Sequence, residues 1–494
     1  MPWLETSFPV RMLRVALVAP AGRLRDMLVI VARAGVVEID TVRADASDAS
    51  QASRILRSAR AETGAGQPAL AEQPPDLGAL ARAGRLDLVA GEAQLQEYSA
   101  AAVRRHSAAA LAGWTPAAQA GALAGELAGI GCAVVPLPRP RGADVPTQVA
   151  GSAGQRALSP LVSTYGTVPY ADINPAWLAW ASYVLMFGMM FGDAGDGLLL
   201  LAAAVALRFG WPRRARKYRA AWPFIVGAGL AATAFGFAYG EFFGPTGVVP
   251  TLWLDPLANP IPLLLAGIGI GAVLLAGAYG LGTINRWREG GWPLALYAPS
   301  GISGALLFGG IGLLAAGWYY HVVPLVLAGA AVAVVALVLA FVGFLAEAGG
   351  GGVGVTQAFV ELFDLVVRLG SNIVSFARLA AFGLAHAAIG LLVWDGTRSL
   401  ANRGGVGVVA AIVVFVLGSA LAFALEALVA AVQALRLEYY ELFSRVFVGQ
   451  GRPFRPWRLP VEAIGERPAG QEQDQAREKD LVVSELREAS WPSG

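Results

Sequence analysis

The stretch SNIVSFARLAAFGLAHAAIG (Ser371–Gly390) suits a lipid bilayer and yet carries a permanent positive charge. It is apolar over most of its length and free of proline, which predicts a helix. Arg378 lies near its middle and His386 lies eight residues further on, with no carboxylate between them. A charge at the centre of a bilayer costs at least about 2.5–3.5 kcal/mol. We therefore expect this helix to face a bundle interior, a water-filled cavity or a partner.

The composition of the whole chain is that of a membrane protein. Only 15% of its 494 residues are charged, whereas soluble proteins average about 25%. The net charge of +2 is too small to favour a nucleic-acid partner. Cys132 is the one cysteine, and the three histidines, His106, His321 and His386, are far apart in sequence. We therefore predict no disulfide framework, no metal site and no cofactor.

Residues 1–170 have the composition of a soluble domain, and no secretory signal is present at the N-terminus. The pattern predicts two small cytoplasmic α+β lobes joined by short helices. Strands are expected at 11–20, 36–40 and 85–91, and helices at 21–35 and 92–106. A turn, a helix and a strand are expected over 113–137. Residues 137–175 are rich in proline and predict a linker.

From Pro175 onward the chain is dominated by apolar segments. A spanning helix needs about 20 apolar residues, and most of the segments are that long. They lie at 176–192, 195–209, 221–243, 257–284, 295–318, 321–347, 355–397 and 405–437. The first two are short, so they cross separately only if the chain breaks tightly at Phe191–Gly197. We predict a transmembrane domain over 171–450 and a cytoplasmic tail over 451–494.

Basic residues decide the number of crossings. Loops rich in arginine and lysine stay in the cytoplasm, and such residues cluster at 213–219, 286–288 and 452–458. The loop at 244–256 has none. Eight crossings place all three clusters on the cytoplasmic side, together with both termini. We therefore predict a mainly α protein with about eight transmembrane helices and a small N-terminal α+β domain.

The seventh and eighth segments are too long for an upright crossing. About 40 helical residues extend about 60 Å, against a hydrocarbon core of about 30 Å. We expect both helices to be tilted and to wrap a curved protein surface. They also hold most of the polar groups at membrane depth: Glu361, Asp364, Arg368, Ser371, Asn372, Ser375, Arg378 and His386 on the seventh, and Glu426, Gln433, Arg436 and Glu438 on the eighth.

Each of these groups has a structural and a functional interpretation. Arg378 is either a structural cation paired with Glu426 or Asp364, or a fixed charge beside a carboxylate that moves past it. His386 is either packed between helices or part of a proton relay. Glu426 either forms a salt bridge to the neighbouring helix or lines a channel. Further carboxylates, Asp193, Asp196 and Glu241, lie near the breaks between earlier segments.

No nucleotide site is predicted in this chain. The phosphate-binding pattern G-x-x-x-x-G-K-[ST] does not occur. AGGGGVGV (Ala348–Val355) lacks the lysine and has no preceding strand. No nucleophile and base stand out together, so we do not expect the chain to be a catalytic subunit.

Four motifs in order resemble subunit a, also called subunit I, of V-type and A-type rotary ATPases. They are the opening segment Val168–Leu200 with its FGD break, FGFAYGEFFG (Phe235–Gly244), the arginine helix Ser371–Ala387, and the final helix and tail Glu426–Trp457. The strand-helix-strand start and GWTP (Gly113–Pro116) are similar to the family's cytoplasmic arm. Here that arm is short, so we expect contacts to a peripheral stalk to be reduced or rearranged.

The resemblance implies a function and a set of site residues. Arg378 matches the essential arginine that faces the rotor ring, and Arg436 matches the second arginine. His386, Glu426 and Asp364 match polar positions of the ion half-channels. Ser371, Asn372, Ser375, Gln433 and Glu361 are candidate channel-lining residues. The implied partners are the rotor proteolipid ring, the peripheral stalk and ATPase head, and membrane lipids.

The resemblance also implies a multi-pass protein of a prokaryotic plasma membrane that carries protons or sodium ions. Two other functions stay open. A stand-alone secondary transporter would show broken helices at corresponding positions of two repeats, and only the break near Asp193 is visible. A membrane scaffold that carries no ions would have no need of Arg378, Glu426 and Arg436.

Overall fold

The structure is a computed structural model of the chain, and it describes residues 9–40, 51–59, 67–140, 144–148, 166–210, 219, 221–447 and 451–462. It divides into two compact units. One unit contains Val10–Pro146 and the segment that begins at Pro453, and we call it the N-terminal unit. The other contains Thr147–Arg452, and we call it the membrane unit.

The N-terminal unit is built on one antiparallel sheet. Its strands follow the order β2-β5-β1-β6, with β4 also paired to β5. They are β1 (Met12–Pro20), β2 (Glu38–Ile39), β4 (Val103–Arg105), β5 (Ala108–Pro116) and β6 (Ala133–Pro136). The two separate lobes expected from the sequence are therefore wrong, since strands from both halves join the same sheet. The long central pair of β1 and β5 causes this, because its nine-residue register brings Met12 opposite Pro116.

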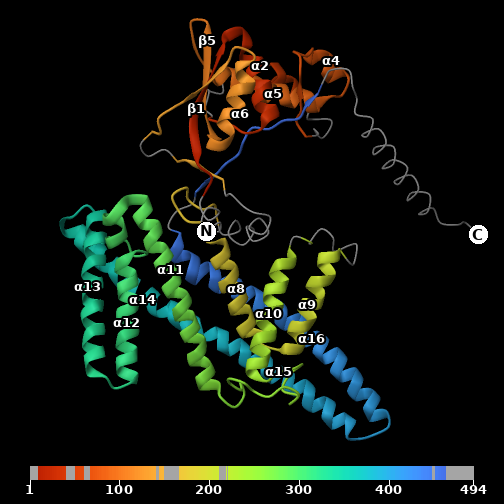
Figure 1. The fold of residues 1–494 in the computed structure, drawn as a ribbon, viewed down its shortest axis with the longest axis vertical. Helices are drawn as coiled ribbons and strands as arrows, with labels where there is room; N and C mark the ends of the chain where they lie inside the picture. Colours follow the sequence, from red (N-terminus) through yellow and green to blue (C-terminus); the bar gives the residue numbers. More distant parts are fainter. Residues whose placement is uncertain are drawn as a thin grey trace, which may run out of the picture. The chain divides into compact units, whose positions relative to one another are not determined.

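Helices pack against this sheet (Figure 1). They are α2 (Leu24–Ala34), α5 (Leu86–Ala101) and α6 (Ala117–Ala128), after the short η1 (Ala21–Arg23), while α3 (Gln51–Ala59) and α4 (Leu77–Arg82) pack near α5. The helix predicted to end at Gly35 does so, with Gly35 in the left-handed region at φ 60°. The strand predicted at 85–91 is wrong, since these residues form the first part of α5, and Gly91 lies in close contact with the carbonyl of Ala69.

The segment after Pro453 belongs to the N-terminal unit. Its strand β9 (Val461–Glu462) pairs in parallel with β3 (Leu70–Ala71). Trp457 is buried in the core of this unit. A second short pair joins β7 (Pro146–Thr147) and β8 (Arg452–Pro453). Residues 463–494, most of the segment predicted as a tail, lie outside the described part of the chain, so the boundaries expected at 170 and 450 stay predictions.

The membrane unit consists almost entirely of helices, as predicted. They are α8 (Ala176–Met190), α9 (Ala194–Phe209), α10 (Trp222–Tyr239), α11 (Pro260–Tyr297), α12 (Ile302–Tyr319), α13 (Val323–Glu347), α14 (Gly351–Ser375), α15 (Ala377–Ala401), α16 (Val406–Leu437), the π-helix η3 (Glu438–Phe443) and α17 (Ser444–Val446). Every apolar segment named from the sequence is helical. α11 is kinked at Gly291, where φ is 70°.

Six of the described helical stretches are long and apolar enough to cross a membrane. α8 is apolar but has 15 residues, and α9 has 16. These two correspond to the pair of short segments that were expected to cross separately. Most of the basic cluster at 213–219, which supported that assignment, lies outside the described residues.

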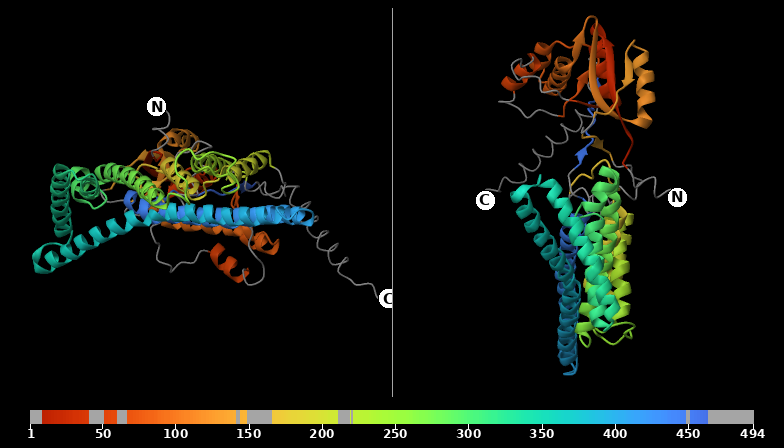
Figure 2. Two further views of the ribbon diagram at one scale, coloured as in Figure 1. Left: turned by 90° about the horizontal axis from the view of Figure 1, so that it is seen from below. Right: turned by 90° about the vertical axis from the view of Figure 1, so that its left-hand side faces the viewer.

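The last three long helices run obliquely to α11, α12 and α13 (Figure 1). α15 and α16 lie side by side in both further views (Figure 2). Together α14 and α15 span 51 residues, or about 75 Å, which is far longer than an upright crossing. The single long helix predicted for the seventh segment is interrupted at Phe376, which turns the chain between α14 and α15.

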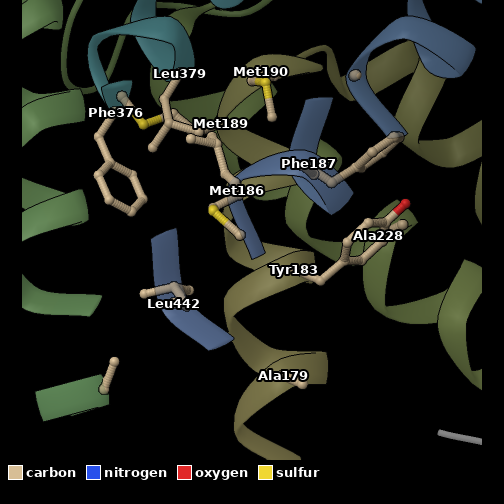
Figure 3. Packing of buried hydrophobic residues seen from close by; sticks show 14 of the residues in the cluster. Ala179, Tyr183, Met186, Phe187, Met189, Met190, Ala228, Phe376, Leu379 and Leu442 are labelled. Carbon is tan, nitrogen blue, oxygen red and sulfur yellow. The ribbon is translucent and has the colours of Figure 1, made fainter. Parts of the chain in front are cut away.

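The core of the membrane unit explains why the chain turns there. Met186, Met189 and Met190 of α8 lie near Phe376, just before α15, and near Leu379 of α15 (Figure 3). The ring of Phe376 is fully buried and occupies the space beside Gly271 of α11, where a Cβ atom would be 2.1 Å from the ring. Any larger residue at 271 would displace the ring and the turn that it anchors.

Candidate functional site

Two polar regions lie along α15, one around Arg378 and one around His386. The two residues are eight positions apart, which is about 12 Å along a helix. Phe376 and Leu379 anchor the start of α15 in the core, so the polar side chains of this helix have fixed backbone positions. We call the two sites the arginine region and the histidine cluster.

Neutral groups hold Arg378 in the arginine region. Its guanidinium donates to the hydroxyl of Ser375 (3.1 Å) and to the side-chain oxygen of Gln433 on α16 (3.4 Å). Ser375 in turn donates to the Glu441 carboxylate of η3. Ser375 therefore links the arginine to an acid on the last helix.

An open groove of about 540 Å³ exposes this arginine. Its lining is provided by Gly370, Ser371, Val374, Ser375 and Arg378, all near the junction of α14 and α15. Ser371 and Ser375 were predicted to line a channel, and the structure places both beside Arg378. A charged group that entered this groove would meet the guanidinium directly.

The structure does not pair Arg378 with either predicted structural partner. Asp364 forms its ion pair with Arg368 one turn away on α14 (2.6 Å), and both side chains are largely exposed. Glu426 is bonded to His386. Within the described residues, no ion pair involves Arg378. The interpretation of Arg378 as a structural cation for Asp364 or Glu426 is therefore wrong.

The histidine cluster brings together four parts of the chain that are distant in sequence. His386 is buried and its Nδ1 atom is hydrogen-bonded to Glu426 of α16. Its Nε2 atom lies 4.0 Å from a carboxylate oxygen of Asp193 and 4.0 Å from one of Glu241. Asp196 is buried nearby, with a carboxylate oxygen within 4.8 Å of the Asp193 and His386 ligand atoms.

Local structure places each carboxylate of the cluster. Asp193 caps the N-terminus of α9, where it accepts from the backbone N–H of Asp196 (3.0 Å). It also accepts from the N–H groups of Phe243 (2.9 Å) and Gly244 (2.6 Å). Glu241 directly follows Gly240, the left-handed residue at the end of α10. The FGD break and the GEFFG motif therefore meet at one point.

The remaining predicted residues lie elsewhere. Arg436 is exposed on α16, about one turn beyond Gln433. Glu361 accepts from Gln357 on α14 (2.9 Å), and this pair is exposed. With its amide turned to satisfy both neighbours, Asn372 accepts from Arg445 (2.7 Å) and donates to the carbonyl of Arg368 (3.1 Å). The structure thus does not bring Glu361 or Asp364 into the arginine region.

Two buried acids were missed as site residues. Glu441 was not singled out, and Glu438 was noted only as a polar group of the eighth segment. Glu438 is almost fully buried and accepts from the Ser182 hydroxyl of α8 (2.7 Å). The π-helix η3 carries both residues, and such helices are frequent at functional sites. The signal was present in RLEYYE (Arg436–Glu441), where two acids follow an apolar helix.

A third group of buried ionisable side chains lies just before α8. Asp172 has no exposed surface and lies 4.0 Å from Arg286, which also pairs with Glu289. Burial, together with the neighbouring Glu289 carboxyl, raises the pKa of Asp172 to about 8. The adjacent Asn285 ties this corner together, since it accepts from the N–H of Ile173 (3.1 Å) and donates to the carbonyl of Val446 (3.3 Å).

The fold and the two polar regions define a multi-pass membrane protein with ionisable side chains buried between its helices. Residues 135–243 match the model of the V-type ATPase 116kDa subunit family. The chain is 26% identical over 376 residues to the A-type ATP synthase subunit I of Aeropyrum pernix, which covers 67% of this chain and 53% of that protein. It is also 26% identical over 334 residues to the subunit I of Thermococcus kodakarensis, covering 65% and 48%.

A shorter match has a higher sequence identity. Over 113 residues the chain is 34% identical to the V-type ATP synthase subunit I 2 of Treponema pallidum, covering 23% of this chain and 24% of that protein. These matches confirm the predicted resemblance: the chain is related to subunit I of V-type and A-type ATPases. It spans about half the length of the archaeal relatives named here.

Proposed function

We propose that the chain is the stator membrane subunit of a rotary ATPase and forms two ion half-channels against a rotor ring. The observation that carries the proposal is the surroundings of Arg378, which offer it hydrogen bonds but no ion pair within the described part of the chain. Its guanidinium is held by Ser375 and Gln433, faces an open groove, and has no carboxylate of its own chain within the described ion pairs. A carboxylate on a passing rotor subunit supplies the missing anion.

Arg378 keeps the two paths apart. An arginine does not lose its proton in a protein, so it cannot pass one on. Its charge favours the ionised form of a carboxylate that comes near. A ring carboxylate that reaches the groove therefore releases its proton or sodium ion before it moves on. Ions consequently cross only by riding the ring from one path to the other.

The two paths correspond to the polar groups on either side of Arg378. One contains the histidine cluster, where His386 and Glu426 lie between Asp193 and Glu241. The other contains Ser375, Glu441 and the buried Glu438 with Ser182. Both sets consist of groups that gain and lose protons or bind cations, which a path across a bilayer requires.

The surface of α16 suits a partner of this kind. Only 6% of its most apolar stretch is buried within the chain. Leu421, Leu425, Leu428 and Val432 are all more than half exposed and follow one side of the helix. A ring of apolar helices and membrane lipid together cover such a face. Arg436 lies on the same helix, where it adds a second positive charge near the ring.

The other partners follow from the same assignment. The N-terminal unit lies in the cytoplasm and ties the stator to a peripheral stalk and the ATPase head. Both chain termini are cytoplasmic. The subunit couples ion flow to ATP hydrolysis or synthesis, and the ATP is bound by other subunits.

Replacement of Arg378 tests the proposal. Arg378→Ala is expected to abolish ATP-driven ion transport in vesicles that contain the assembled complex, while assembly itself is retained. Arg368→Ala is the matched control, because Arg368 lies on α14 in an exposed pair with Asp364. It is expected to leave transport within about twofold of the unmodified complex, since exposed pairs contribute at most about 1 kcal/mol. Normal transport in the Arg378→Ala complex would refute the mechanism.

A further inference from the structure

We propose that the histidine cluster is a binding site for a divalent transition-metal ion of the Zn²⁺ class. The ligands are His386, Asp193, Asp196 and Glu241, and Glu426 supports the histidine from behind. The sequence predicted no metal site because the histidines are scattered. A single histidine suffices here because three carboxylates from other segments converge on it.

The distances suit one small ion. Ligand atoms of Asp193, Asp196 and His386 all lie within 4.8 Å of one another, and the three residues are buried. His386 Nε2 is 4.0 Å from Asp193 and 4.0 Å from Glu241. Two ligands of a tetrahedral zinc ion are about 3.3–3.5 Å apart when the bonds are about 2.0–2.1 Å. The 4.0 Å pairs therefore need to shorten by about 0.6 Å, and a pair at the 4.8 Å limit by about 1.4 Å, which side-chain rotation can supply.

Several atoms in this space have no hydrogen-bond partner among the described residues. Asp196 Oδ1, Glu241 Oε2 and His386 Nε2 are buried and form no hydrogen bond. Their residues are only 5%, 2% and 6% exposed. A buried polar atom that forms no hydrogen bond is destabilising, and here three of them meet in one cluster. A bound cation satisfies all three at once.

Glu426 sets the histidine in the state that a metal requires. When the Nδ1–H group donates a hydrogen bond to the Glu426 carboxylate, Nε2 is unprotonated. Its lone pair then points toward Asp193 and Glu241. A carboxylate behind a metal-bound histidine is the usual arrangement, because it fixes the tautomer and orients the ring. Glu426 is also the most exposed member of the cluster, with 14% of its side chain accessible.

The mixture of ligands selects the type of metal. One imidazole nitrogen with carboxylate oxygens suits zinc, whereas magnesium and calcium prefer oxygen ligands alone. Three backbone N–H groups hold Asp193 in place, so it is the rigid side of the site. Asp196 and Glu241 each have one carboxylate oxygen that forms no hydrogen bond within the described residues. Their side chains are therefore the ones that move toward the ion.

Occupancy has a consequence that rests on the proposed function. When zinc is bound, His386 and the carboxylates of the cluster no longer take part in the ion half-channel. Zinc therefore acts as an inhibitor of ion transport. Binding itself does not depend on that function, and the two are measured separately.

The test uses the full chain, purified in detergent and stripped of metal with a chelator. Zinc binding is measured by equilibrium dialysis and metal analysis. We expect one zinc ion per chain, no binding in His386→Asn, and at least tenfold weaker binding in Asp196→Asn. His321→Asn is the matched control, because His321 is exposed and outside the cluster, and it should bind as the unmodified chain does. Added Mg²⁺ should not compete.

Equal zinc binding by the unmodified chain and His386→Asn would overturn the proposal, and so would the absence of stoichiometric binding. If His386→Asn fails to fold, Glu241→Gln and Co²⁺ serve instead. Bound Co²⁺ should give the visible absorption of tetrahedral coordination in the unmodified chain and lose it in Glu241→Gln. If zinc binds but does not inhibit transport in the assembled complex, the metal site is supported and the proposed ion path is contradicted.

Discussion

Arg378 and His386 lie on one helix but have opposite surroundings. The hydrogen-bond acceptors around Arg378 are neutral, whereas His386 is surrounded by carboxylates. Direct contact with a carboxylate of the same chain would neutralise the arginine permanently. The chain instead places Ser375 between Arg378 and Glu441, so that the cation is oriented and its charge remains available in the groove.

Asp172 gives a prediction for the pH dependence of stability. Its pKa in the folded protein is raised to about 8, so the folded state holds a proton that the unfolded chain has already lost. Its contribution to stability therefore falls as the pH rises from about 4 to about 8. Asp172→Asn removes that loss and should raise the apparent Tm in detergent by a few degrees at pH 8, but little at pH 5.

Asp26→Asn serves as the comparison, because it removes a carboxylate from an exposed pair with Arg23 and not from a buried site. A lower Tm for Asp172→Asn at pH 8 would mean that the ionised carboxylate is stabilised by Arg286. It would contradict the assignment of a protonated acid.

Two departures from regular helix position the polar groups of the membrane unit. The turn at Phe376 separates α14 from α15, and the groove opens at this junction beside Arg378. The π-helix η3 at the end of α16 carries Glu438 and Glu441 inward, where both are buried. An uninterrupted α-helix would follow a different register over these residues.

The segment that carries Trp457 provides a test at the level of an element. Trp457 lies against Tyr98 with ring centroids 4.8 Å apart, and its indole donates to Gln94 (3.0 Å). Trp457→Ala should destabilise the N-terminal unit by about 3–5 kcal/mol and speed hydrogen exchange over 453–462. Arg33→Ala removes only an exposed pair with Glu72 and should cost less than about 1 kcal/mol. Unchanged exchange in Trp457→Ala would show that β9 holds the segment alone.

At the scale of the whole molecule, the number of crossings decides which segments share a side of the membrane. Eight crossings require α8 and α9 to cross separately, although each is shorter than the other spans. The two helices pack closely with α10, since Gly236 lies where a Cβ atom would be 2.0 Å from the backbone of Ala194. Close packing within the bundle allows short helices at membrane depth, because protein rather than lipid surrounds the break between them, where residues 186–197 are buried.

Labelling with an impermeant maleimide tests this arrangement. In a Cys132→Ser background, cysteines at the exposed positions Arg104 and Val248 should react from opposite sides of the membrane. Arg104→Cys should be labelled from the cytoplasm and Val248→Cys from outside. Labelling of both from the same side would contradict eight crossings.

The sequence by itself determined the helical membrane fold, the α+β class of the N-terminal unit and the relationship to subunit I. These depend on composition, on segment length and on motifs that are local in the chain. It also singled out Arg378, since a charge in an apolar helix is visible without coordinates. Only the tertiary structure decided which groups meet: Asp193 and Glu241 reach His386, and Glu441 reaches Ser375. Those contacts join residues 66 to 193 positions apart, and they depend on the breaks and turns that set the packing of the helices.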